Sequence, residues 1–313
     1  MNSAELIRKI KDLLKDLTKK KNILFVKRGN TAIEEVIKLS KALGKEKILI
    51  QDQGGWITYK QFANKYGLMC IEVKTDYGLT DLEDLEKKTD GKSVFIVNSM
   101  PGYYADEDMH KVAKVCEKKH CLLVNDVSGS IGLKLAKYGD IILGSFNRWK
   151  PINMLKGGFL AFDDQVMTHY QMIPETQTFV KRFFSLIHYF RKSETENSED
   201  SAKSDQQNSQ IFEGFQEFQF KDDELETLYS KIQDIGKRQK FFSKHHWKIK
   251  KDLKHFDMIH PKRKGINVIV KYKDDEEKNK IIKYCEQENL EYTECPRYIR
   301  VNEKAISIEV KRL

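Results

Sequence analysis

A chain of 313 residues can bury a sizeable hydrophobic core, and 40% apolar residues indicate a globular protein rather than a disordered one. Its net charge of +9 raises the question of a nucleic-acid partner, but acidic residues are interleaved with the lysines almost as densely, which favours solvated helix faces. No apolar run reaches the length of a membrane span, and the charged N-terminal stretch lacks a signal-peptide core. The five cysteines show no paired spacing, so we expect a reducing, cytoplasmic setting, without zinc, nucleic acid or membrane contact.

Strand and helix signals alternate along the first half of the chain. Residues 22–30 and 47–52 are short apolar runs that stop at Gly, Asn or Asp, and residues 31–44 between them carry apolar residues at helical spacing. This alternation predicts an α/β fold with a mostly parallel sheet, helices on both faces, and ligands outside the carboxyl ends of the strands. It continues with strand patterns at 69–73, 93–99, 121–126, 139–145 and 157–162, and helical patterns at 59–67, 79–88 and 108–120.

The alternation of strand and helix signals ends after residue 163. Residues 193–210 contain no large apolar residue and are rich in Ser, Glu, Asp and Gln, which is typical of a flexible polar insert. From residue 222 a long helical pattern leads to a strand-helix-strand unit at 266–272, 275–290 and 305–310. We therefore expect a large α/β domain over 1–190, a flexible insert and connector over 191–221, and a long helix with a small C-terminal α+β domain over 222–313.

The ends of the predicted strands carry the residues with chemical potential. Asp126 closes one strand, Ser145 and Lys150 follow the next, and the turn at 28–32 opens the first long helix. Free N–H groups at a helix start suit a phosphate. A carboxylate 24 residues before a lysine suits a cofactor that needs a protonated ring nitrogen at one end and a Schiff base at the other. The pattern predicts pyridoxal phosphate.

Each of these residues taken singly has an ordinary structural interpretation. Asp126 is of a type that commonly caps a helix after a strand, and Trp56 is of a type that is more often core than cofactor platform. Lys150 by itself would be a surface lysine. The prediction of a cofactor site therefore depends on the joint pattern.

The run from residue 125 to residue 162 resembles the fold type I pyridoxal-phosphate enzymes, most closely the DegT/DnrJ/StrS-type sugar aminotransferases. In that family one strand ends in Glu-Asp, and a second ends in Ser-Phe with the cofactor-binding lysine four residues after the Phe. Two glycines follow further on. Here Asn125-Asp126, Ser145-Phe146, Lys150 and Gly157-Gly158 fall at the corresponding places.

The resemblance implies a role for each matching residue. Lys150 would bind the cofactor covalently and move the proton, and Asp126 would keep the pyridine nitrogen protonated so that the ring acts as an electron sink. Trp56 would stack on the ring. The phosphate would be held by Asn30, Thr31 and Ser145. A homodimer is implied as well, in which Gln216, within Gly214-Phe215-Gln216, reaches the phosphate of the partner subunit.

Three departures from the family pattern concern the substrate side. The glutamine that contacts the phenolic side of the cofactor, three residues after the Asp, is Gly129 here. We expect the segment that precedes the phosphate turn and helps to bind sugars in the family to be absent, because that turn begins only about 28 residues into the chain. Arg297 and Arg300 are candidates for binding a donor carboxylate, unless they face solvent at a strand edge.

Two functions from different classes remain open on the sequence. The first is a homodimeric aminotransferase that moves an amino group from an amino acid such as glutamate to a keto sugar or another carbonyl compound. The second is a degenerate relative that keeps the fold as a non-catalytic subunit. A different pyridoxal-phosphate reaction, such as lyase or desulfurase chemistry, stands beside them. Retention of Asp126 and Lys150 favours an enzyme.

Overall fold

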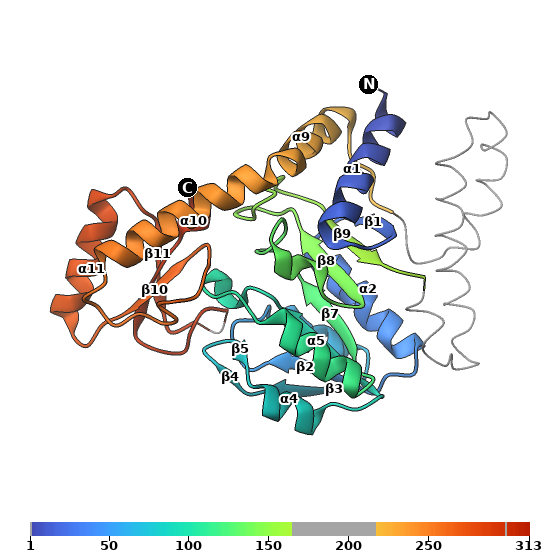
Figure 1. Cartoon of the computed structure of the whole chain (residues 1–313), viewed down its shortest axis with the longest axis horizontal. Helices are drawn as coiled ribbons and strands as arrows, with labels where there is room; N and C mark the ends of the chain where they lie inside the picture. Colours follow the sequence, from blue (N-terminus) through green and yellow to red (C-terminus); the bar gives the residue numbers. More distant parts are fainter. Residues whose placement is uncertain (1, 165–216, 298) are drawn as a thin grey trace.

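The computed structural model describes residues 2–164, 217–297 and 299–313 (Figure 1). A seven-stranded sheet forms the centre of the fold, in the order β1-β9-β8-β7-β6-β2-β3. Neighbouring strands from β8 to β3 run parallel, whereas β9 runs antiparallel between β1 and β8. The predicted mostly parallel sheet is therefore confirmed. Its strands are β1 (Asn22–Val26), β2 (Lys47–Gln51), β3 (Met69–Val73), β6 (Ser93–Asn98), β7 (Leu122–Asp126), β8 (Ile141–Ser145) and β9 (Gly158–Phe162).

Helices cover both faces of this sheet because successive strand residues point to opposite sides. In β7, Leu122 and Val124 pack with the helix pair α2 (Gly29–Ala42) and α3 (Thr58–Lys65). Leu123 between them packs with α5 (Met109–Lys118) on the other side. A strand that is buried on both faces needs apolar residues at every position, which explains the continuous apolar runs in the sequence.

Helices α1 and α4 complete the helical cover of the large body. α1 (Ser3–Thr18) buries Leu6, Ile10 and Leu14 against strands β1 and β9 and against α9 (Asp222–Gln233). α4 (Leu82–Lys88) packs beside α5 on the same face of the sheet, through Leu85. The short hairpin β4 (Thr75–Asp76) and β5 (Leu79–Thr80) precedes it. Within the described residues, 3₁₀ turns lie at Pro101–Tyr103, Lys134–Lys137 and Val310–Arg312.

The C-terminal part begins with two helices that follow one another rather than one long helix. α9 ends at Gln233, and α10 (Ile235–Asp252) leads away from the large body to the small unit (Figure 1). That unit is a three-stranded sheet in the order β10-β12-β11, with α11 packed on it. Its elements are β10 (Val268–Lys271), α11 (Asp275–Gln287), β11 (Tyr292–Cys295) and β12 (Ala305–Ile308). Among the described residues, no helix is long and apolar enough to cross a bilayer.

The small unit is joined to the large body beside the carboxyl ends of the parallel strands. The 3₁₀ turn after β6 places Tyr103 where its carbonyl accepts hydrogen bonds from the N–H groups of Ile266 (2.7 Å) and Asn267 (2.8 Å). These two residues immediately precede β10. The seam between the two parts therefore runs along the edge of the sheet at which ligands bind in parallel α/β folds.

Candidate active site

A cavity of about 530 Å³ lies at this seam. Its walls come from the segments that follow β1, β2, β6, β7 and β8, and from the C-terminal unit. Five residues singled out from the sequence line it together, namely Asn30, Trp56, Asp126, Ser145 and Lys150. Thr31 is not among the lining residues, and Gln216 lies outside the described residues.

Asp126 is the last residue of β7, and only 5% of it is exposed. Its Oδ1 accepts a hydrogen bond from the backbone N–H of Ser128 (2.9 Å), and its Oδ2 accepts one from the hydroxyl of Tyr59 (2.5 Å). These donors fix the orientation of the carboxylate. Burying a charge is costly without an opposite charge, and within the described chain no cationic side chain forms an ion pair with Asp126. A cationic group on a ligand would provide that partner.

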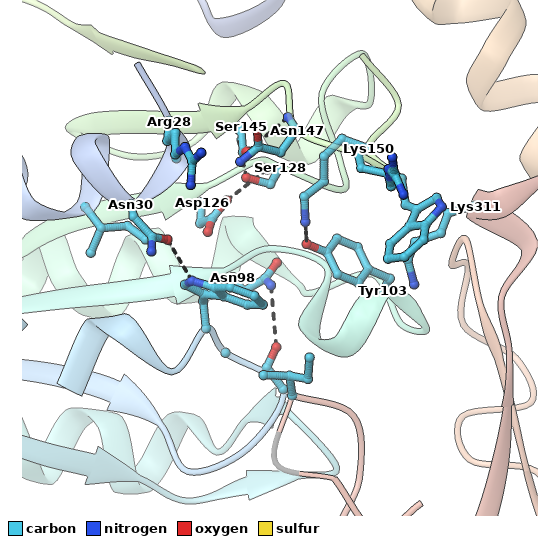
Figure 2. A pocket seen from close by; sticks show the side chains of 18 of the residues that line it. Arg28, Asn30, Asn98, Tyr103, Asp126, Ser128, Ser145, Asn147, Lys150 and Lys311 are labelled. Atoms are coloured by element: carbon cyan, nitrogen blue, oxygen red, sulfur yellow. Dashed lines mark hydrogen bonds between the residues drawn. The ribbon is translucent and has the colours of Figure 1, made fainter. Parts of the chain in front are cut away.

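Lys150 lies on the opposite side of the cavity from the start of α2, as Figure 2 shows. It follows Trp149, which adopts a left-handed backbone conformation (φ 61°) that is uncommon for a residue with a side chain. The Lys150 amine donates a hydrogen bond to the hydroxyl of Tyr103. The amine lies 4.4 Å from the centroid of the Tyr103 ring and 5.9 Å from that of Trp56. The lysine therefore points into the cavity between two aromatic rings.

The start of α2 forms an anion cradle with the end of β8. Arg28 precedes the helix in an extended conformation, and no side chain caps the free N–H groups that follow. A Cβ atom placed on Gly29 would lie 2.7 Å from Cβ of Ser145, so only glycine lets the helix start approach the Ser145 side chain. Unpaired N–H groups, the positive end of the helix, a hydroxyl and an arginine together suit a phosphate.

Trp56 follows β2 after Gly54 and Gly55, and a residue of the cradle helix α2 fixes its position. Its indole N–H donates a 2.9 Å hydrogen bond to Oδ1 of Asn30. The Asn30 side chain therefore orients the tryptophan through its oxygen. Its Nδ2 amide and its backbone N–H, in the first turn of α2, remain as donors that Asn30 can offer to a phosphate.

The C-terminal unit contributes a strongly basic wall. Glu309 pairs with Arg300 (3.3 Å) and with Lys311, and all three side chains are almost completely buried. Burial alone would raise the pKa of Glu309, but the charges of Arg300 and Lys311 outweigh it and lower that pKa to about 2. Burial and the nearby Arg300 lower the pKa of Lys311 well below its usual range. The Arg312 guanidinium lies 4.1 Å from the centroid of the Trp149 ring.

Sequence reasoning did not single out several of the residues just described, among them Tyr59, Tyr103 and Lys311. Tyr59 lies within a helical pattern and Tyr103 within an irregular turn, and neither position has a spacing that marks a site. Lys311 is one lysine among many near the C-terminus. For Tyr103, the only signal in the neighbouring sequence is Gly102, the residue before it. Gly102 adopts a left-handed backbone (φ 55°), a conformation that glycine permits in tight turns.

This donor set fits pyridoxal phosphate in each of its parts. Asp126 offers a buried carboxylate for the ring nitrogen, Lys150 an amine for the aldehyde, and Trp56 an aromatic face for the ring. The cradle at Gly29 and Ser145 offers donors for the phosphate. These groups line a single cavity, although they come from four separate segments of the chain.

Comparison with solved structures shows the same fold at low sequence identity. A putative sugar aminotransferase, Spr1654 from Streptococcus pneumoniae, is 13% identical with a TM-score of 0.67, over 97% of this chain and 86% of that one. 3-amino-5-hydroxybenzoic acid synthase is 14% identical with a TM-score of 0.65, over 98% and 85%. The GDP-4-keto-6-deoxy-D-mannose-3-dehydratase of E. coli is 13% identical with a TM-score of 0.68, over 97% and 87%.

Comparison with family models divides the chain in two. No curated protein matches the chain by sequence. Residues 238–313 match the MJ1341 family C-terminal domain. Residues 2–200, which are more than half of the chain, match the DegT/DnrJ/EryC1/StrS aminotransferase family. The resemblance that the sequence suggested is thus confirmed, and the chain belongs to the DegT/DnrJ/EryC1/StrS aminotransferase family, with pyridoxal phosphate as its cofactor.

Proposed function

We propose that this protein is an aminotransferase that takes an amino group from an amino acid such as glutamate and passes it to a keto sugar or another carbonyl compound. The observation that carries the proposal is that Asp126 and Lys150 line one cavity together with a phosphate cradle. A non-catalytic subunit that only bound the cofactor's phosphate would need the cradle but neither Asp126 nor Lys150. Because Asp126, Lys150 and the cradle all line one cavity, a catalytic function is favoured over a non-catalytic one.

The residues of the chain divide the work of such a reaction. Bound pyridoxal phosphate supplies an electron sink for the bond that breaks at the α-carbon of the amino acid. Asp126, whose orientation is fixed by Tyr59 and Ser128, would hold a proton on the ring nitrogen. The Lys150 amine lies within the cavity, where it would take and return the proton of the α-carbon. Trp56 would offer its aromatic face to the cofactor ring.

For the donor carboxylate, we propose Arg297 rather than Arg300. Arg300 is already engaged, since its guanidinium pairs with Glu309 and also donates to the carbonyl of Ile299 (3.0 Å). Arg297 lines the cavity and forms no ion pair within the described chain. Arg148 lines the same cavity and is likewise without an ion pair there. Two unpaired guanidinium groups favour substrates that carry carboxylate or phosphate groups.

We also propose that the active unit is a homodimer. Two large exposed apolar side chains line the cavity, Trp149 (38%) and Leu155 (62%), and a third, Ile57 (49%), directly follows the lining residue Trp56. Exposed apolar residues that gather at one place favour a protein interface. A second copy of the chain would cover this rim, and Gln216 stays a candidate for a contact with the phosphate in the partner subunit.

The attachment of the cofactor to Lys150 can be tested by borohydride reduction followed by peptide mapping. We expect the pyridoxyl group on Lys150 and no label in the Lys150→Ala variant. Lys156→Ala is the matched control, because Lys156 is six positions away and pairs with Glu224 outside the cavity. It should label like the wild type. A label on another lysine in the wild-type protein would overturn the assignment.

The class of reaction can be tested by a donor screen on the cofactor-loaded protein. An aminotransferase should convert the cofactor to its amine form with one donor, and a carbonyl acceptor should then restore the original absorbance. Steady release of ammonia or sulfide without a lasting absorbance change would indicate lyase or desulfurase chemistry instead. No response to any amino donor would favour the non-catalytic alternative.

A further inference from the structure

We propose that Tyr103 makes the hydrogen bond at the phenolic oxygen of the cofactor that other members of the family obtain from a glutamine. In the family pattern, that glutamine stands three residues after the aspartate. This chain has Gly129 there, and glycine has no side chain to offer. The proposal rests on the proposed attachment of the cofactor to Lys150.

The space beside Gly129 is filled by the Tyr103 ring. A Cβ atom added at position 129 would lie 2.6 Å from Cδ1 and 2.9 Å from Cε1 of Tyr103. Real Cβ atoms do not approach other atoms so closely, and the ring is buried. A glutamine at position 129 and a tyrosine at position 103 therefore exclude one another, and this chain has the tyrosine.

The hydroxyl of Tyr103 lies at the reactive end of the site. It accepts a hydrogen bond from the Lys150 amine, the group to which the cofactor would attach (Figure 2). In pyridoxal phosphate, the phenolic oxygen is carried by the ring carbon next to the one that bears the aldehyde. A hydroxyl that contacts the lysine nitrogen would therefore lie near the phenolic oxygen of a bound cofactor, and a tyrosine hydroxyl can donate a hydrogen bond to that oxygen.

Tyr103 is held firmly in this place. Its carbonyl accepts the two N–H groups that precede β10, and its ring lies 4.9 Å from the Lys311 amine and 5.4 Å from the Arg300 guanidinium. Its backbone is left-handed (φ 72°), which is uncommon for an aromatic residue and persists only where the surroundings enforce it. The strain lies at the residue whose hydroxyl reaches Lys150, which favours a functional reason for it.

The test is a pH titration of the visible absorption of the resting cofactor-loaded protein, without donor or acceptor. When the lysine nitrogen is protonated, its proton also bonds to the phenolic oxygen. Once that proton is lost, the phenolate needs another donor, so a hydrogen bond to it favours the deprotonated form. Removing this hydrogen bond in Tyr103→Phe should therefore raise the midpoint of the absorbance titration by about one pH unit or more. The phenyl ring still fills the space beside Gly129, so this variant should fold.

Tyr284→Phe is the matched control, because it also removes a tyrosine hydrogen bond to a side chain, that of Asp252, but in the C-terminal unit away from the cavity. Its titration should match that of the wild type. The double variant Tyr103→Gly/Gly129→Gln frees the space and restores the family residue, so its midpoint should return toward the wild-type value.

Two outcomes would overturn the proposal. One is a Tyr103→Phe curve that superimposes on the wild-type curve, whatever its shape. The other is a double variant whose midpoint stays where that of Tyr103→Phe lies. Neither readout needs turnover, so a failure here is separate from a failure of the aminotransferase proposal, and the labelling of Lys150 tests the attachment independently.

Discussion

At the scale of single residues, the sharpest feature of the site is the double anchoring of Asp126. Both carboxylate oxygens accept a hydrogen bond, one from Tyr59 and one from Ser128. Asp126→Asn is nearly isosteric, but its amide has one acceptor oxygen where the carboxylate has two. One of the two donors therefore faces an N–H₂ group, which should reduce the free energy of unfolding by about 1–2 kcal/mol. The variant should still fold and bind the cofactor.

The functional effect of Asp126→Asn should be much larger than its effect on stability. An amide cannot hold a proton on the ring nitrogen, so the ring becomes a poorer electron sink. We expect conversion of the cofactor by an effective donor to slow on the order of 100-fold or more, measured by the absorbance change in a single half-reaction. Equal rates in the two proteins would reduce Asp126 to a structural cap.

Site residues could be predicted from the sequence where the adjacent residues along the chain form a recognisable pattern. Asp126 ends a strand, Ser145 ends the next one, and Lys150 follows at a fixed spacing, so each has a local sign. Tyr59 has none, because the contact that matters joins it to a residue 67 positions away. Tyr103 contacts Lys150 across 47 positions. Such pairs follow from the order of strands in the sheet, which the sequence does not display.

At the scale of elements, the site depends on how closely the start of α2 approaches the end of β8. Gly29→Ala would place a Cβ atom 2.7 Å from Cβ of Ser145, so the helix start must move away and the cradle must widen. We expect the dissociation constant of pyridoxal phosphate to rise about tenfold or more, measured by absorbance titration of the cofactor-free protein. Binding of pyridoxal, which lacks the phosphate, should change much less.

Gly236→Ala gives the matched comparison for this prediction. Gly236 lies in α10, and a Cβ atom there would meet nothing within 4 Å. The added methyl group should raise stability by up to about 1 kcal/mol through helix propensity and leave cofactor affinity unchanged. A Gly29→Ala protein that binds both pyridoxal and its phosphate like the wild type would show that the cradle does not hold the phosphate.

Elements were predictable where burial imposes a period on the sequence. Every strand of the large sheet coincides with an apolar run, because helices cover each strand on at least one face. The break between α9 and α10 at Asp234 was not predicted, because the apolar period continues through it. β11 was missed as well, since Tyr292–Cys295 is a short strand with mixed polarity at the edge of its sheet.

At the scale of the whole molecule, part of the positive charge is concentrated at the seam between the two parts. Arg28, Arg148, Arg297, Arg300, Lys311, Arg312 and Lys150 line the cavity, whereas Asp126 is the one acidic residue among the described lining. The C-terminal unit supplies four of these basic residues, of which Arg300 and Lys311 are paired with the buried Glu309. Part of the basic charge of the chain therefore has a local role at this cavity, which a count over the sequence could not separate from solvated lysines.

The proposed dimer makes a prediction about two exposed apolar residues with nearly equal exposure. Leu155 (62% exposed) lines the cavity, as Trp149 does, and Met69 (61% exposed) lies on the edge strand β3. In a two-fold dimer each substitution acts twice, and an unpaired carboxylate in an apolar interface is costly. Leu155→Glu should therefore raise the dimer dissociation constant by about 100-fold or more, measured by sedimentation over a range of concentrations. Met69→Glu should leave it unchanged. Two outcomes would mean that two copies do not meet at the rim of the cavity. One is a wild-type protein that stays monomeric while it binds the cofactor tightly. The other is a Met69→Glu variant that dissociates as readily as Leu155→Glu.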